Sequence, residues 1–229
     1  MIQKINRMSL VEQVAAQIEE LIQSEQWTVG AKIPPETELM EQFAVSRNTL
    51  REAIRALVHA GLLETKQGSG TIVRSKNTLD AALKKYVKKA TMLETVDVRI
   101  ALEKQAAELA AHHRTDQDLA QLEASIKACQ QAAEQDDVDQ FIASDINFHK
   151  AVVHAGNNQL LIQLYEPLTE VLYAFIQDII TLDKPFQYEE GLHTDLLDAI
   201  RTQDAEAAAH YIESYLKIVK ENVMTMMEE

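Results

Sequence analysis

Three side chains in the C-terminal half of the sequence have the types and the spacing of a metal site. Asp145 and His149 are four residues apart in the string SDINFH, so on a helix both project from one face. His193 begins a separate amphipathic segment. A carboxylate and two imidazoles on facing helices suit a divalent transition metal that keeps open positions. Because hydrogen-bonded and solvated Asp–His pairs have the same spacing, both interpretations stay open.

A second group of polar side chains lies in the string FAVSRNTLREAIRALVHAGLL. Arg47, Arg51 and Arg55 follow one another at intervals of four, which places them on one side of a helix that Ser46 can cap. A helix that reads the major groove of DNA needs hydrogen-bonding cations near its N-terminal end and an apolar back. Arginines at this spacing also form ordinary solvated faces. The capped turn and the hairpin that follows favour DNA binding.

The composition indicates a mainly α, soluble protein. With 6 Gly and 4 Pro in 229 residues, an all-β fold is disfavoured, and the single cysteine, Cys129, is expected to be buried. Residues 1–90 carry 13 Lys and Arg against 10 Asp and Glu, whereas residues 91–229 carry 9 against 26. This change of sign predicts two domains with different partners. The sequence shows no signal peptide and no bilayer-spanning run, so we expect a cytoplasmic protein without membrane contact.

The N-terminal segment changes its periodicity along the chain. Residues 9–24 form an amphipathic helix with five apolar positions on one face, Leu10, Val14, Ile18, Leu21 and Ile22. A short helix over 36–43, a three-residue turn and a helix over 47–60 come next. Residues 62–73 then read as two short strands around Gly-Ser-Gly. This order predicts a winged helix-turn-helix with a small β-hairpin wing within residues 1–75.

The remainder of the chain has helical periodicity. Residues 91–229 read as about six amphipathic helices with short connections and no strand, which predicts an all-α antiparallel helical bundle. Residues 76–90 are rich in lysine and are expected to hold a linker and the start of the first bundle helix.

The string SRNTLREAIRAL…GLL…GSGTIV resembles the DNA-binding domain of GntR-family bacterial transcription regulators. The resemblance covers about residues 8–75. One departure is Thr37, where family members often carry an arginine. The resemblance implies that operator DNA is contacted by Ser46, Arg47, Asn48, Thr49 and Arg51, and by Gln67 and Gly68 at the tip of the wing.

The helical half resembles the FCD domain, the effector-binding domain of the FadR subfamily of GntR proteins. The resemblance rests on the Asp-x-x-x-His pair and on HTDLLDAI, and it implies that Asp145, His149 and His193 hold a divalent transition metal such as Zn, Ni or Mn. The family's fourth ligand, a histidine, aligns with Tyr215. The site therefore holds metal weakly, uses the phenol, or is metal-free with Tyr215 binding effector. Arg99 falls where the family sends an arginine into the effector cavity; a surface ion pair with Asp97 or Glu103 is the alternative.

Together these features predict an effector-responsive transcriptional regulator, a repressor rather than an enzyme. A homodimer would read a short inverted repeat in double-stranded operator DNA, and the bundle would bind a small carboxylate effector. One alternative is a non-haem metal enzyme that uses the Asp-His-His set. Another is an architectural DNA-binding protein with an inert bundle.

Overall fold

The computed structural model describes residues 8–66, 68, 70–182 and 190–228. The chain divides into two compact units, Met1–Lys85 and Tyr86–Glu229. Each unit folds around its own set of buried apolar side chains. Within the described residues, no helix combines the length and the apolar character needed to cross a membrane.

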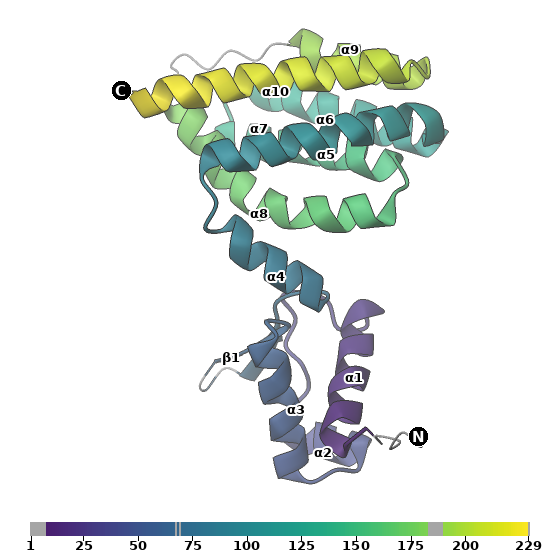
Figure 1. Cartoon of the computed structure of the whole chain (residues 1–229), viewed down its shortest axis with the longest axis vertical. Coiled ribbons are helices and arrows are strands. Elements are labelled where there is room, and N and C mark those ends of the chain that lie inside the picture. The colour runs from purple at the N-terminus through teal and green to yellow at the C-terminus, as the bar shows by residue number, and fades with distance from the viewer. Residues whose placement is uncertain (1–7, 67, 69, 183–189, 229) are drawn as a thin grey trace, which may run out of the picture. The chain divides into compact units, whose positions relative to one another are not determined.

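Three helices form the framework of the first unit: α1 (Leu10–Gln23), α2 (Glu36–Phe43) and α3 (Arg47–His59) (Figure 1). α1 begins with a capping box in which Ser9 and Glu12 each accept the other's backbone amide. Val14 and Ile18 are buried as expected. Leu10 was expected on the same face but is 61% exposed, because it is the first residue of the helix and lies beyond the core.

The turns around α3 depend on two residues with positive φ. Ala44, at the end of α2, has φ 52° and turns the chain into α3. Gly61 follows α3 with φ +81°, and a Cβ placed there would come within 3.0 Å of the Ala81 Cβ. Glycine meets both requirements at this position, since it has no side chain and tolerates positive φ. The predicted helix-turn-helix is therefore confirmed.

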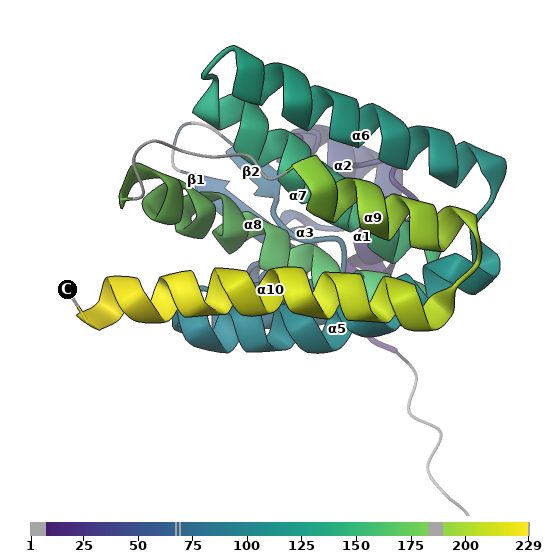
Figure 2. The same ribbon diagram turned by 90° about the horizontal axis from the view of Figure 1, so that it is seen from above.

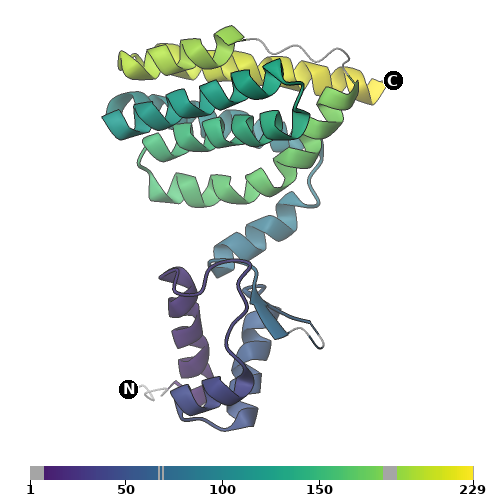
Figure 3. The same ribbon diagram turned by 180° about the vertical axis from the view of Figure 1, so that it is seen from behind.

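The wing is a hairpin of β1 (Leu63–Lys66) and β2 (Gly70–Val73), paired antiparallel from Leu63–Val73 to Lys66–Gly70 (Figure 3). The connection between α1 and α2 pairs with the other side of β2. Gly30 donates its amide to the Val73 carbonyl at 2.9 Å, and Ile33 donates to the Thr71 carbonyl at 3.0 Å. Strand β2 is therefore paired on one side with β1 and on the other side with residues 30–33, which are distant from it in sequence.

The second unit contains long helices, as expected: α5 (Met92–His113), α6 (Asp116–Glu134), α7 (Val138–Ala155), α8 (Gln159–Leu182), α9 (Glu190–Arg201) and α10 (Ala205–Glu228) (Figure 2). Two ion pairs join α5 to α10, Asp97 with Lys220 and Lys104 with Glu213, each at 2.5 Å. Their order shows that the two helices run antiparallel. Cys129 is fully buried in this unit.

Small residues let α5 and α7 approach closely. Ala106, Ala107 and Ala110 of α5 have no exposed surface. A Cβ on Gly156, which ends α7, would lie 3.2 Å from both the Ala106 carbonyl oxygen and the Leu109 Cβ. The glycine therefore permits a helix contact that a larger residue would push apart.

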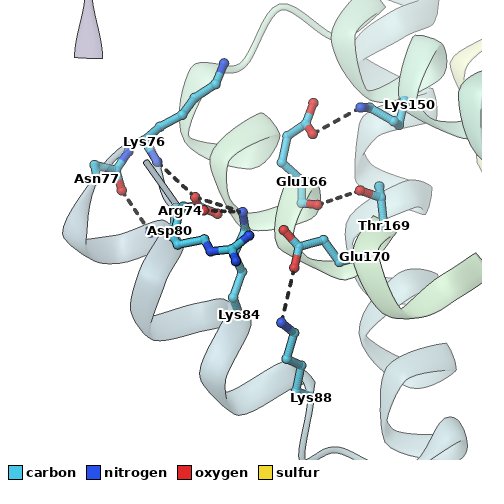
Figure 4. A network of polar contacts seen from close by, with 10 residues as sticks. All are labelled: Arg74, Lys76, Asn77, Asp80, Lys84, Lys88, Lys150, Glu166, Thr169 and Glu170. Atoms are coloured by element: carbon cyan, nitrogen blue, oxygen red, sulfur yellow. Dashed lines mark hydrogen bonds and ion pairs between the residues drawn. The ribbon is translucent and has the colours of Figure 1, made fainter. Parts of the chain in front are cut away.

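Residues 76–90 were expected to include the start of the first bundle helix, and they do not. They hold a separate helix, α4 (Thr78–Val87), and the first bundle helix starts only at Met92. The reason is local, because Thr91 and Glu94 form a capping box that begins a new helix. Within α4, Asp80 pairs with Lys84 at 3.2 Å, and in the second unit Lys88 lies 3.7 Å from Glu170 (Figure 4).

Candidate functional site

The N-terminal end of α3 is a polar, exposed surface above an apolar back. Ser46 caps the helix by accepting the Thr49 amide at 3.2 Å, and the hydroxyls of these two residues lie 2.9 Å apart. Arg47 and Asn48 are exposed, whereas Leu50 on the opposite face is fully buried. The predicted residues therefore form one exposed polar surface at the N-terminal end of α3.

Arg51, one turn further along α3, is held by the first turn of α2. Its Nε donates to both carboxylate oxygens of Glu36, at 3.1 and 2.9 Å. Both side chains are substantially exposed, so this pair contributes little to stability. Because this contact is made through Nε, the two terminal NH₂ groups of the guanidinium can donate to a base or a phosphate.

The structure describes one of the two residues that are predicted to contact DNA from the tip of the wing. Gly68 is exposed with φ +74°, whereas Gln67 lies outside the described residues. Thr65 and Thr71 face each other across the hairpin, with their hydroxyl oxygens 3.1 Å apart. Thr37, where the family often has arginine, is exposed on α2.

The second unit brings Asp145, His149 and His193 together in its interior. All three are buried, and one ligand atom from each lies within 4.8 Å of the others. Asp145 Oδ1 is 3.2 Å from His193 Nε2 and 3.7 Å from His149 Nε2. Helices α7 and α9 supply these residues, as the spacing of the sequence predicted.

Glu103 of α5 completes the cluster and was not predicted as a site residue. Its Oε1 accepts hydrogen bonds from Arg99 Nε at 2.6 Å and from the Tyr165 hydroxyl at 2.8 Å. Its Oε2 lies 2.7 Å from His149 Nδ1. The ion pair of Arg99 with Glu103 was considered only as a surface pair, but both residues are at most 2% exposed. Asp97 pairs with Lys220 instead.

Tyr215 occupies the remaining side of the cluster. Its ring stacks on that of His149 with centroids 5.3 Å apart, and its hydroxyl is 3.5 Å from Asp145 Oδ1. Burial raises the pKa of this phenol well above its ordinary value. Tyr215 is therefore a neutral hydrogen-bond donor in this cluster at neutral pH.

Burial disfavours the charged form of each group in the cluster, and the neighbouring opposite charges offset this effect. Burial alone would raise the pKa of Glu103, but Arg99 and His149 lower it to about 2. Burial alone would lower the pKa of His149, but Glu103 and Asp145 raise it to about 9. The pKa of Asp145 is opposed by burial and still lies below its usual range, because His149 and His193 face it. Both carboxylates are therefore ionised at neutral pH.

A winged helix-turn-helix with a cationic α3 defines the class of DNA-binding proteins. Here it is joined in one chain to a helical bundle with a buried polar cluster. Residues 10–73 match the bacterial regulatory proteins of the gntR family, and residues 94–217 match the FCD domain. The chain belongs to the GntR family and carries a C-terminal FCD domain. The resemblance drawn from the sequence is thereby confirmed.

Individual relatives agree with this assignment. The chain is 29% identical over 222 residues to the putative L-lactate dehydrogenase operon regulatory protein of Escherichia coli, covering 92% of this chain and 84% of the relative. It is 33% identical over 190 residues to the E. coli galactonate operon transcriptional repressor, covering 78% and 81%. The solved structure of Streptococcus agalactiae GntR is 27% identical, with a TM-score of 0.63 over 92% of this chain and 99% of that one. The chain is a DNA-binding transcriptional regulator, and the non-haem enzyme alternative is unsupported.

Ser46 offers a test that separates helix capping from DNA contact. Ser46→Ala should lower the free energy of unfolding by about 1 kcal/mol, because the Thr49 amide loses its cap. Ser46→Asp should keep the cap and the stability, yet its negative charge should weaken binding to a duplex selected by the wild-type protein. Denaturant unfolding and DNA titrations check both variants. Wild-type DNA affinity in Ser46→Asp would remove Ser46 from the interface.

Proposed function

We propose that this regulator is a homodimeric repressor that binds a short inverted repeat in operator DNA and responds to a small carboxylate. It would act in the cytoplasm, where bacterial operators are found. One combination of features carries the proposal: an exposed cationic helix end in one unit and a buried cluster with Arg99, Asp145 and His149 in the other. The proposed repressor activity is based on the similarity to the galactonate operon transcriptional repressor of E. coli.

The proposed DNA contact places the N-terminal end of α3 in the major groove. Arg47 and Arg51 carry guanidinium groups suited to the O6 and N7 atoms of guanine, while Ser46 and Thr49 suit a phosphate. Gly68 and Gln67 would approach the neighbouring minor groove. A two-fold dimer would present two such helices to the two halves of an inverted repeat.

The buried cluster fits a divalent transition metal. Asp145, His149 and His193 supply the donor set, and His149 Nε2 makes no hydrogen bond in the described structure. A bound Zn, Ni or Mn ion would supply local positive charge for an anionic ligand. Tyr215 replaces the histidine found in related sites, and its neutral hydroxyl is suited to donate a hydrogen bond to an effector oxygen.

Arg99 is the proposed anchor of the effector carboxylate. Its Nε is engaged by Glu103, which fixes the plane of the guanidinium, and its remaining N–H groups can bind a carboxylate. Effector binding changes operator affinity only if it favours one arrangement of the DNA-binding units over another.

Replacing Arg47 or Arg51 with alanine should weaken binding to the selected duplex by about 1–3 kcal/mol and relax its sequence preference, as expected for a side chain that reads guanine. Lys127→Ala removes an exposed cation from α6 and serves as the matched control. Fluorescence anisotropy titrations at fixed salt measure the effect. Unchanged affinity and preference in both arginine variants would contradict the proposed recognition helix.

Asp145→Asn should reduce the affinity for Zn²⁺ by more than the roughly 10- to 100-fold typical of losing an outer-shell partner, because it removes the anionic ligand. Glu134→Gln removes an equal charge from an exposed position and should bind Zn²⁺ like the wild type. Equilibrium dialysis with elemental analysis gives the bound metal. Equal Zn²⁺ content in Asp145→Asn and the wild type would refute the site.

Arg99→Lys should abolish stabilisation by the effector while leaving effector-free DNA binding intact, because lysine keeps the charge beside Glu103 but lacks the planar fork. The measurement is a melting-temperature screen of small carboxylates, with and without Zn²⁺, on both proteins. A hit that stabilises Arg99→Lys as much as the wild type would exclude Arg99 as the anchor.

A further inference from the structure

The two carboxylate oxygens of Glu103 contact different side chains. Oε1 accepts from Arg99 Nε at 2.6 Å and from the Tyr165 hydroxyl at 2.8 Å. Oε2 faces His149 Nδ1 at 2.7 Å. These contacts join α5 to α7 and α8 through a single side chain with no exposed surface.

The contact with His149 is exclusive among the described residues. Neither Glu103 Oε2 nor His149 Nδ1 has a hydrogen-bonding partner elsewhere, and both atoms are buried. Their separation of 2.7 Å leaves no room for a water molecule between them. A metal ion that binds His149 must displace the proton on Nε2, the atom that faces Asp145, while the proton on Nδ1 stays beside Glu103.

We propose that Glu103 is the positioning residue of the metal site, orienting His149 so that Nε2 is presented to a divalent transition metal shared with Asp145 and His193. This inference rests on the proposed metal site and adds a residue that has no contact with the ion. Arg99 and Tyr165 hold the carboxylate itself in place. A metal-ligating histidine generally donates its second ring N–H to such an acceptor, which fixes the tautomer.

A second role for Glu103 must be separated from this one, because the residue also balances the charge of Arg99. A counter-ion acts on folding stability, whereas a positioning residue acts on the affinity and geometry of the metal. Glu103→Gln distinguishes the two. Arg99 and Tyr165 both donate to Oε1, so the glutamine oxygen should take that place and its NH₂ should face His149. The imidazole proton is then driven to Nε2, where it blocks metal binding.

The experiment is a titration of the full-length protein with Co²⁺, followed by its visible d–d absorption, with circular dichroism to check the helices. Glu103→Gln should lower Co²⁺ affinity by about 10- to 100-fold and change the band shape. Ile142→Val removes one buried methyl group from α7 but leaves the contacts of Glu103 and His149 unchanged, so it should bind Co²⁺ with near wild-type affinity. The double variant Arg99→Gln/Glu103→Gln removes both buried charges together and provides a folded comparison if the single variant unfolds.

Wild-type Co²⁺ affinity and spectrum in a folded Glu103→Gln or double variant would overturn the proposal while leaving the metal site intact. An equal loss of affinity in Ile142→Val would also overturn it, since general loosening of the bundle would then explain the effect. If the wild type itself shows no Co²⁺ bands, or shows the same bands as Asp145→Asn, the metal site fails and the role of Glu103 fails with it.

Discussion

Arg99 and Glu103 lie one turn apart on α5, and both side chains are withdrawn almost completely from solvent. Removing one partner of such a pair would leave an uncompensated buried charge, which costs several kcal/mol. Glu103 therefore requires Arg99 and also engages Tyr165 and His149 on two other helices. The polar centre of the second unit is built outward from this pair, and the surrounding alanines of α5 allow the helices to close around it.

The two units differ in where their functionally important charged side chains lie. In the first, the arginines of α3 are exposed, where a cation is stable in water and available to phosphates. In the second, the charges of the cluster are buried and balanced locally. Physiological salt screens exposed charges beyond about 8 Å, so the net acidity of the whole chain does not by itself exclude binding to DNA. An acidic chain can therefore carry a DNA-binding surface.

The sequence predicts the fold well because its strongest patterns are local. Ser46, Gly61 and the glycines of the hairpin define where elements begin and end, and the four-residue spacing of Asp145 and His149 places both on one face. Glu103 was missed because burial of a charged side chain depends on contacts between helices that no local pattern records. Tyr165 is buried on α8, and its hydrogen bond to Glu103 is likewise a property of the packed bundle. The start of α5 was misplaced, although Thr91 and Glu94 carry a capping-box pattern.

The pairing of residues 30–33 with β2 has a consequence for how this protein can vary. A lone two-stranded hairpin is marginally stable and exposes two unpaired edges. Here one edge of β2 is covered by Gly30, Ala31 and Ile33, so the hairpin stem belongs to the body of the domain. The pairing of the stem is made by residues 63–66, 70–73 and 30–33. The length of the wing can thus change without altering the segments that anchor its stem to the helix-turn-helix.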